Sequence, residues 1–106
     1  NNEYYLEVKG VTLEDKGNCM FPDAPTERGT KHILELIEIK ESHMGAGILF
    51  LVQLSGAKTF SPHKEMDKKF SEALTLAHEK GVDIFCYDCN VGEDYIEIKD
   101  PVEIIL

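Results

Sequence analysis

Glu7 and Lys9 are the two residues whose types and spacing could do chemistry. They lie two positions apart in the segment from Tyr4 to Leu13, which is rich in β-branched and aromatic residues and predicts a strand. Side chains two apart on a strand project from the same face, so a carboxylate and an ammonium would lie side by side. In a metal-dependent phosphodiesterase such a carboxylate binds Mg²⁺, which positions and acidifies a water, and the lysine stabilises the developing phosphorane charge. Mg²⁺ requires several oxygen ligands, so Glu7 would need a second acidic residue beside it.

A basic stripe on the first predicted helix is the other candidate. Arg28, Lys31, His32 and Glu35 recur at i, i+3, i+4 and i+7, opposite an apolar side that carries Ile33, Leu34, Leu36 and Ile37. Taken alone, both features have a plainer interpretation. The Glu7 and Lys9 pair can be an ordinary ion pair on a half-solvated strand, and the helix stripe can be a solvated polar face.

The elements that would position these residues alternate between strands and helices. Tyr4 to Leu13 and Cys19 to Phe21 predict a β-hairpin around a turn at 14–18. Asp23 or Thr26 would cap the first helix, which runs to about Glu41. The run from Ile48 to Val52 is continuously apolar, which predicts a strand at the centre of the sheet that is covered on both faces.

The second half of the chain continues the pattern. Asp67 predicts the N-cap of a second helix that runs to Lys80 and stops at Gly81. A strand over 82–91, a hairpin partner over 95–99 and an edge strand over 102–106 follow. The helix between the strands 48–52 and 82–91 makes that pair parallel, so the sequence predicts an α/β fold with a mixed sheet flanked by helices.

Length and composition bound the function. The 106 residues suffice for one domain, and the apolar run from Gly47 to Leu54 is too short to span a membrane. Three cysteines, with Cys86 and Cys89 on opposite faces of a strand about 10 Å apart, predict reduced thiols and a cytoplasmic protein. The net charge of -9 opposes nucleic-acid binding unless a local basic stripe, a metal or further sequence supplies it.

Several motifs occur together in this chain and resemble those of the sugar fermentation stimulation protein family. The matching segments are Glu7-Val8-Lys9-Gly10-Val11-Thr12-Leu13, Phe21-Pro22-Asp23-Ala24-Pro25-Thr26, Arg28-Gly29 and Lys31-His32. Further matches are Val52-Gln53, Phe60-Ser61-Pro62, Asp67 and Gly81-Val82. The resemblance covers most of the chain, although many members have glutamine at the position of Thr30 and a serine is common at Gly10.

The resemblance implies a restriction-endonuclease-like core of the PD-(D/E)XK type. Glu7 would be a metal ligand with the Val8 carbonyl as a second one, and Lys9 would be the catalytic cation. Arg28, Lys31 and His32 would present donors to phosphate. The family also implies an aspartate on the strand before Glu7 and an N-terminal OB-like domain. Both would lie upstream of Asn1, so residues 1–106 would be the C-terminal nuclease-like part of a longer protein and inactive alone.

Three functions follow as expectations. The first is a DNA-handling, Mg²⁺-dependent nuclease, for which the resemblance also admits RNA and a homodimer. The alternative is a non-catalytic DNA-binding regulatory protein that keeps the nuclease fold as a scaffold. A third interpretation, which follows from the acidic balance, is a protein-interaction domain unrelated to nucleic acid. The sequence leaves the substrate, the strand preference and the pathway open.

Overall fold

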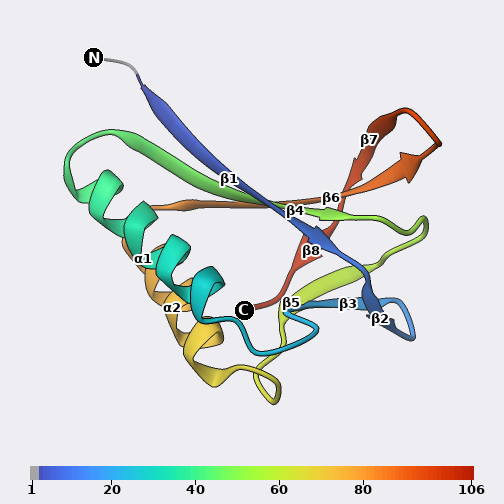
Figure 1. Ribbon diagram of the computed structural model, residues 1–106, viewed down its shortest axis with the longest axis horizontal. Helices are drawn as coiled ribbons and strands as arrows, with labels where there is room; N and C mark the ends of the chain where they lie inside the picture. Colours follow the sequence, from blue (N-terminus) through green and yellow to red (C-terminus); the bar gives the residue numbers. More distant parts are fainter. Residues whose placement is uncertain (1–2) are drawn as a thin grey trace.

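The computed structural model describes residues 3–106 and places their strands in two four-stranded sheets (Figure 1). The main sheet has the order β1-β4-β6-β7, and the small sheet has the order β2-β3-β5-β8. The elements follow one another as β1 Tyr4–Val11, β2 Leu13–Asp15, β3 Asn18–Phe21, α1 Glu27–Glu41, β4 Gly45–Val52, β5 Thr59–Pro62, α2 Lys68–Glu79, β6 Asp83–Val91, β7 Ile96–Pro101 and β8 Glu103–Ile104. The α/β class and the mixed sheet predicted from the sequence are confirmed.

Strand β4 lies inside the main sheet, as its apolar run predicted. It pairs in parallel with β1 on one side and with β6 on the other, and β7 closes the sheet antiparallel to β6. Parallel neighbours need long crossover connections. Here α1 lies in the connection between β1 and β4, and α2 lies in the connection between β4 and β6. The predicted parallel pair and the predicted hairpin are therefore both present.

The hairpin predicted at the start of the chain is wrong in its first strand. Only Leu13 to Asp15 pairs with β3, around a turn in which Lys16 and Gly17 have positive φ angles of 52° and 89°. Strand β1 instead joins the main sheet beside β4. Thr12 separates β1 from β2, and the chain passes there from one sheet to the other, a change that residue alternation along a single strand does not signal.

The two helices begin next to each other. The Thr26 side chain accepts a hydrogen bond from the Gly29 N–H at 2.9 Å, so Thr26 rather than Asp23 is the cap of α1. Asp67 caps α2 by accepting from the Phe70 N–H at 3.0 Å, and its other oxygen accepts from the Thr26 N–H at 2.9 Å. One carboxylate therefore satisfies donors at the start of both helices. Helix α2 ends before Gly81, whose φ of +93° matches the predicted stop.

The two helices and the small sheet lie on the same side of the main sheet (Figure 1). The core fills the space between them and the main sheet. Phe50 of β4 is at its centre, with ring centroids 4.4 Å from Phe60, 5.6 Å from Phe21 and 6.5 Å from Phe70. We call the side of the main sheet that carries Phe50 the inner face. Leu34, predicted on the apolar side of the first helix, is 45% exposed, which corrects that placement.

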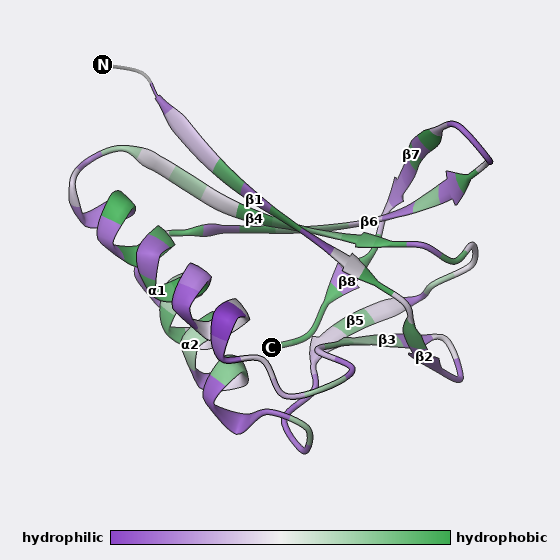
Figure 2. Cartoon of the chain, in the orientation of Figure 1, coloured by the Kyte–Doolittle hydropathy of each residue, from purple (hydrophilic) through white to green (hydrophobic). Residues whose placement is uncertain are grey.

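The opposite side of the main sheet is not covered by any element of residues 3–106. We call it the outer face and define it by Leu6, Val8, Leu49, Leu51, Phe85 and Tyr87. The prediction that β4 is covered on both faces is therefore met on the inner face alone within this part of the chain. Figure 2 shows β4 in green over its second half, because both faces of the strand carry apolar residues there. No helix of residues 3–106 is long and apolar enough to cross a membrane.

Candidate functional site

Glu7, Lys9 and His32 form one polar cluster beside β1. Lys9 Nζ lies 3.7 Å from Glu7 Oε1 and 3.0 Å from His32 Nδ1, and His32 Nδ1 lies 3.4 Å from the same Glu7 oxygen. The predicted adjacency of Glu7 and Lys9 is therefore present, and His32 reaches them from α1. A lysine ammonium has donors only, so His32 Nδ1 accepts from Lys9 while the imidazole is neutral.

The position of β1 explains how these charges lie on the inner face without being buried. Their partners on β4 are Ile48 for Glu7 and Phe50 for Lys9, both fully buried. Strand β1, however, is at the edge of the main sheet. The side chains of Glu7, Lys9 and His32 keep 34%, 16% and 23% of their surface exposed. The cluster is thus partly desolvated and open to a ligand at the sheet edge, which strengthens its electrostatic interactions relative to a fully exposed group.

The other two members of the predicted basic stripe do not join this cluster. The side chains of Arg28 and Lys31 are exposed on α1, and within residues 3–106 neither side chain makes a hydrogen bond or an ion pair. They are free to contact a ligand that approaches α1. Glu35, one turn after His32, lines with Glu7 and His32 a shallow hollow of about 190 Å³. The helix therefore presents both signs of charge to the edge of the sheet.

A divalent cation would find two oxygen ligands on β1. The Glu3 and Val11 carbonyls accept hydrogen bonds from residues 45 and 53, so the odd-numbered carbonyls of β1 point toward β4. By alternation, the Val8 carbonyl points to the free edge, on the side where Glu7 is accessible. Two oxygens fit a cation only as part of a larger set, because hard cations take about six ligands. Within residues 3–106, no three His, Cys, Asp or Glu side chains converge to hold a metal.

The thiols are not part of any such site. Cys19, Cys86 and Cys89 are free and buried, as the sequence predicted. Burial raises the pKa of the Cys86 thiol to about 12, and it also raises the pKa of the other two. Buried, protonated thiols are poor nucleophiles and poor metal ligands. Their role is packing.

Gln53 lies away from the cluster. Its amide nitrogen would be 3.0 Å from a Cβ added at Gly10, and it follows Leu51 on the outer side of β4. Gln53 therefore does not point into the cluster. The same contact shows that a serine at Gly10, common in the resembling family, would require the Gln53 side chain to move.

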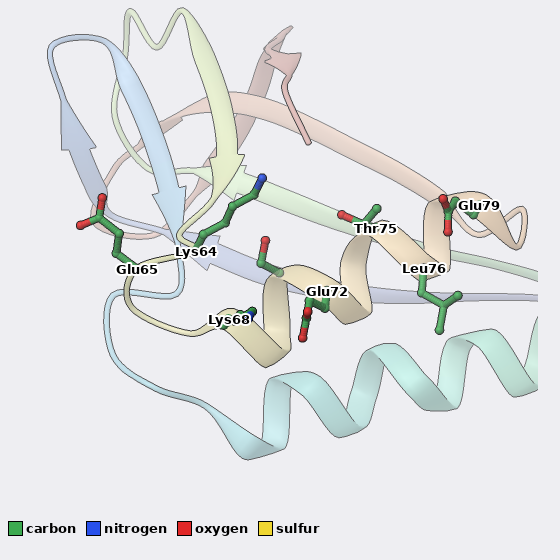
Figure 3. Close-up of a pocket in the computed structure, with 8 residues that line it drawn as sticks. Lys64, Glu65, Lys68, Glu72, Thr75, Leu76 and Glu79 are labelled. Carbon is green, nitrogen blue, oxygen red and sulfur yellow. The ribbon is translucent and has the colours of Figure 1, made fainter.

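Another surface hollow lies along α2 rather than beside β1. It is an open groove of about 640 Å³ along the exposed side of α2. Figure 3 shows Lys64 and Glu65 before the helix and Lys68, Glu72 and Glu79 along it, with acidic and basic groups spread apart rather than gathered around a point. Nothing in that lining converges as the Glu7, Lys9 and His32 cluster does.

The fold and the cluster define an α/β protein whose mixed sheet carries an acid and a lysine on its edge strand. The same fold occurs in a solved structure described as "The structure of Pyrococcus Furiosus SfsA in complex with Ca2+". The two are 30% identical with a TM-score of 0.87, over 95% of this chain and 44% of that one.

The family follows from the sequence comparisons. A family model described as "Sugar fermentation stimulation protein RE domain" matches residues 1–95, and the chain belongs to this family. A sugar fermentation stimulation protein homolog from Clostridium novyi is 98% identical over all 106 residues, which make up 46% of that relative. A homolog from Clostridium tetani is 65% identical over 98% of the chain and 45% of the relative. The chain thus spans about half the length of the curated relatives it matches.

Proposed function

We propose that this chain supplies the carboxylate and the lysine of a divalent-metal-dependent nuclease site in a longer, DNA-handling protein. The observation that carries the proposal is the cluster of Glu7, Lys9 and His32, with separations of 3.0 to 3.7 Å at the open edge of the main sheet. In this proposal the fold is of the restriction-endonuclease, PD-(D/E)XK type. The missing acidic ligand is an aspartate on a further strand beside β1, outside these 106 residues.

Each residue has a role that its surroundings support. Glu7 and the Val8 carbonyl would hold the cation, which would be Mg²⁺ during turnover. The choice of a divalent ion rests on the Ca²⁺ described for the Pyrococcus furiosus relative. The cation, when bound, supplies a more acidic water and neutralises phosphate charge. Lys9, held in place by Glu7 and His32, would present its ammonium to the phosphorane oxygens on which negative charge develops.

DNA contact in this proposal depends on α1. Arg28 and Lys31 are exposed and unpaired within residues 3–106, so both can contact phosphates on DNA that approaches the cluster. The net charge of -9 means that the remaining surface repels DNA. Binding therefore concentrates at this stripe and at the cation. RNA shares the phosphate chemistry and is the obvious competitor in a binding assay.

The test is DNA cleavage by the full-length protein with Mg²⁺. Lys9→Ala should lower the rate by about 10²- to 10³-fold, the usual cost of removing one charge-stabilising donor. Lys69→Ala, an exposed lysine of α2 away from β1, should leave the rate unchanged. Equal rates for the Lys9 variant and the unmodified protein would remove Lys9 from the mechanism.

A second candidate function is a non-catalytic DNA-binding regulator on the same scaffold. It is favoured by the shortage of acidic ligands, since within residues 3–106 Glu7 has no second carboxylate that converges with it on a metal. In that case DNA affinity would fall steeply with salt and would not change when Mg²⁺ is added. Measuring the affinity across salt concentrations, with Mg²⁺ and with a chelator, separates the two functions.

A further inference from the structure

The groove along α2 has the shape of a docking site for another helix. Its lining comes from residues 64–79 alone, so no other element of residues 3–106 fills its volume of about 640 Å³ (Figure 3). Among the lining residues, Ser71 is buried, Thr75 is half-buried and Leu76 is 40% exposed. Small side chains let a second helix approach closely, and an exposed leucine gives it an apolar contact.

The charges on this side of α2 are in an unusual order. Lys68 is the first residue of the helix and Glu79 is the last. A basic group at the N-terminus and an acidic group at the C-terminus both oppose the helix dipole. The caps Asp67 and Lys80 follow the favourable order, so the reversal belongs to the exposed side. Within residues 3–106, neither Lys68 nor Glu79 forms an ion pair that would offset it.

A second copy of α2 in the antiparallel orientation complements both charges. A twofold axis opposite the middle of the helix places Lys68 of each copy beside Glu79 of the other copy. Each charge then lies near the end of the other helix whose dipole it complements. A parallel copy would place Lys68 beside Lys68 and Glu79 beside Glu79, so the charges select the antiparallel arrangement.

We infer that the full-length protein forms a dimer in which α2 packs antiparallel against α2 of a second copy. At a rise of 1.5 Å per residue, Leu76 lies about 4 Å along the helix from the twofold axis, so the two Leu76 side chains contact each other. Glu72 lies opposite Thr75 of the other copy, whose hydroxyl can donate to it. A contact made by one helix from each copy is small, so the dimer is weak and reversible. The inference is independent of the nuclease proposal, because it involves none of the residues of the cluster.

Charge reversal in the full-length protein tests the inference. Sedimentation between about 1 µM and about 1 mM should show a monomer that dimerises as the concentration rises. Lys68→Glu and Glu79→Lys, each made alone, replace two attractive pairs by two repulsive ones and should raise the Kd of the dimer about 30-fold. The double variant restores opposite charges in both pairs and should dimerise with nearly the unmodified Kd.

The single variants are protected from a simple folding failure. Each brings one end of α2 into the order that the helix dipole favours, so the monomer should be at least as stable to urea as the unmodified protein. Lys99→Glu is the matched control, because this exposed lysine lies on β7, far from α2 (Figure 1), and it should leave the Kd unchanged. Glu72→Gln should tighten the dimer, since the two Glu72 carboxylates are the one like-charge approach in the antiparallel register.

Three outcomes would overturn the inference. A protein that remains monomeric at about 1 mM does not use the groove for a second copy. A dimer whose Kd is the same in both single variants forms through another surface. A double variant that dimerises as weakly as the single variants shows that Lys68 and Glu79 do not face each other across the interface. Recovery of the dimer in the double variant supports the antiparallel pairing.

Discussion

The two faces of the main sheet carry the same kinds of side chain in opposite surroundings. On β4, Ile48, Phe50 and Val52 of the inner face are fully buried, while Leu49 and Leu51 between them stay partly exposed. The inner face is covered by the helices and the small sheet, whereas no element of residues 3–106 covers the outer face. A continuously apolar strand therefore predicts a sheet that is covered on both faces, but it does not predict which part of the protein covers each face.

The candidate site is an exception to this contrast, because its side chains lie on the inner face and are nevertheless partly exposed. Glu7 and Lys9 belong to the inner face by strand parity, but β1 is the edge strand and leaves them partly exposed. Two charges could not be kept near Phe50 deeper in the sheet without a large desolvation cost. A polar cluster on a mostly apolar face is the signal that sets Glu7, Lys9 and His32 apart from ordinary surface ion pairs.

Substitutions in β4 test the contrast between the faces most strongly. Phe50→Ala removes the centre of the aromatic cluster and should lower the free energy of unfolding by about 3–5 kcal/mol. Leu49→Ala, its neighbour on the outer face, should cost about 1 kcal/mol in the 106-residue chain. Urea unfolding of both variants measures the difference. If Leu49→Ala costs as much as Phe50→Ala, the outer face is already covered in this chain.

A substitution of Asp67 tests how the two helices that cover the inner face are held together. Its two oxygens accept from the Phe70 and Thr26 N–H groups, so Asp67→Ala leaves a donor at the start of each helix without its partner. The expected loss of stability is about 2 kcal/mol, measured by thermal or urea unfolding. Asp23→Ala, in the exposed loop before α1, is the control and should cost little. Equal effects of the two variants would contradict the bridging role of Asp67.

Cys86, the inner-face partner of Phe50 on β6, should make the fold sensitive to alkaline pH. Burial raises its pKa from 9.0 to about 12, so the folded state favours the neutral thiol. The associated stability is fully present below pH 9 and is lost as the pH rises toward 12. Cys86→Ala should cost about 1 kcal/mol at neutral pH and should flatten the decline in the free energy of unfolding above pH 9. An unchanged slope would show that other groups, such as Tyr4, cause the decline.

The smallest effect is expected on the outer face. Tyr4→Phe removes the hydrogen bond to Asp83 and should lower the free energy of unfolding by about 0.5 kcal/mol, since the pair is exposed. Tyr95→Phe, at a hydroxyl that has no bond to another side chain within residues 3–106, is the control and should have no effect. A loss above 2 kcal/mol, comparable to that of Asp67→Ala, would mean that the Tyr4 hydroxyl is more deeply buried than the outer face allows.

Local signals predicted much of the architecture. Helix caps and stops depend on short-range hydrogen bonds and backbone angles, so Asp67 and Gly81 were recognisable in the sequence, and Thr26 was one of two candidates for the first cap. The parallel pair of β4 and β6 followed from the helix between them. The sequence did not predict the partner of β1 or the division into two sheets. The alternation of apolar and polar residues along a strand is the same whichever strand pairs with it.

The candidate site divides in the same way. The common face of Glu7 and Lys9 is a consequence of strand geometry and was predicted. The 3.0 Å contact between Lys9 and His32 joins residues 23 positions apart and depends on how α1 packs against β1. Arg28 and Lys31 lie on the same helix but do not reach the cluster, so membership of the predicted stripe did not decide which residue would enter it.

By itself, the sequence determined both helices and most of the strands, which residues share a strand face, and the family to which the chain belongs; it did not predict β5 Thr59–Pro62, a segment expected to be a loop. These properties depend on neighbours within a few positions, where backbone geometry leaves few choices. Only the tertiary structure decided that β1 takes the edge of the main sheet, that His32 completes the cluster, and that one apolar face remains open. Each of those outcomes depends on the packing of distant segments, whose free energy is shared among many contacts and is not encoded in any single motif.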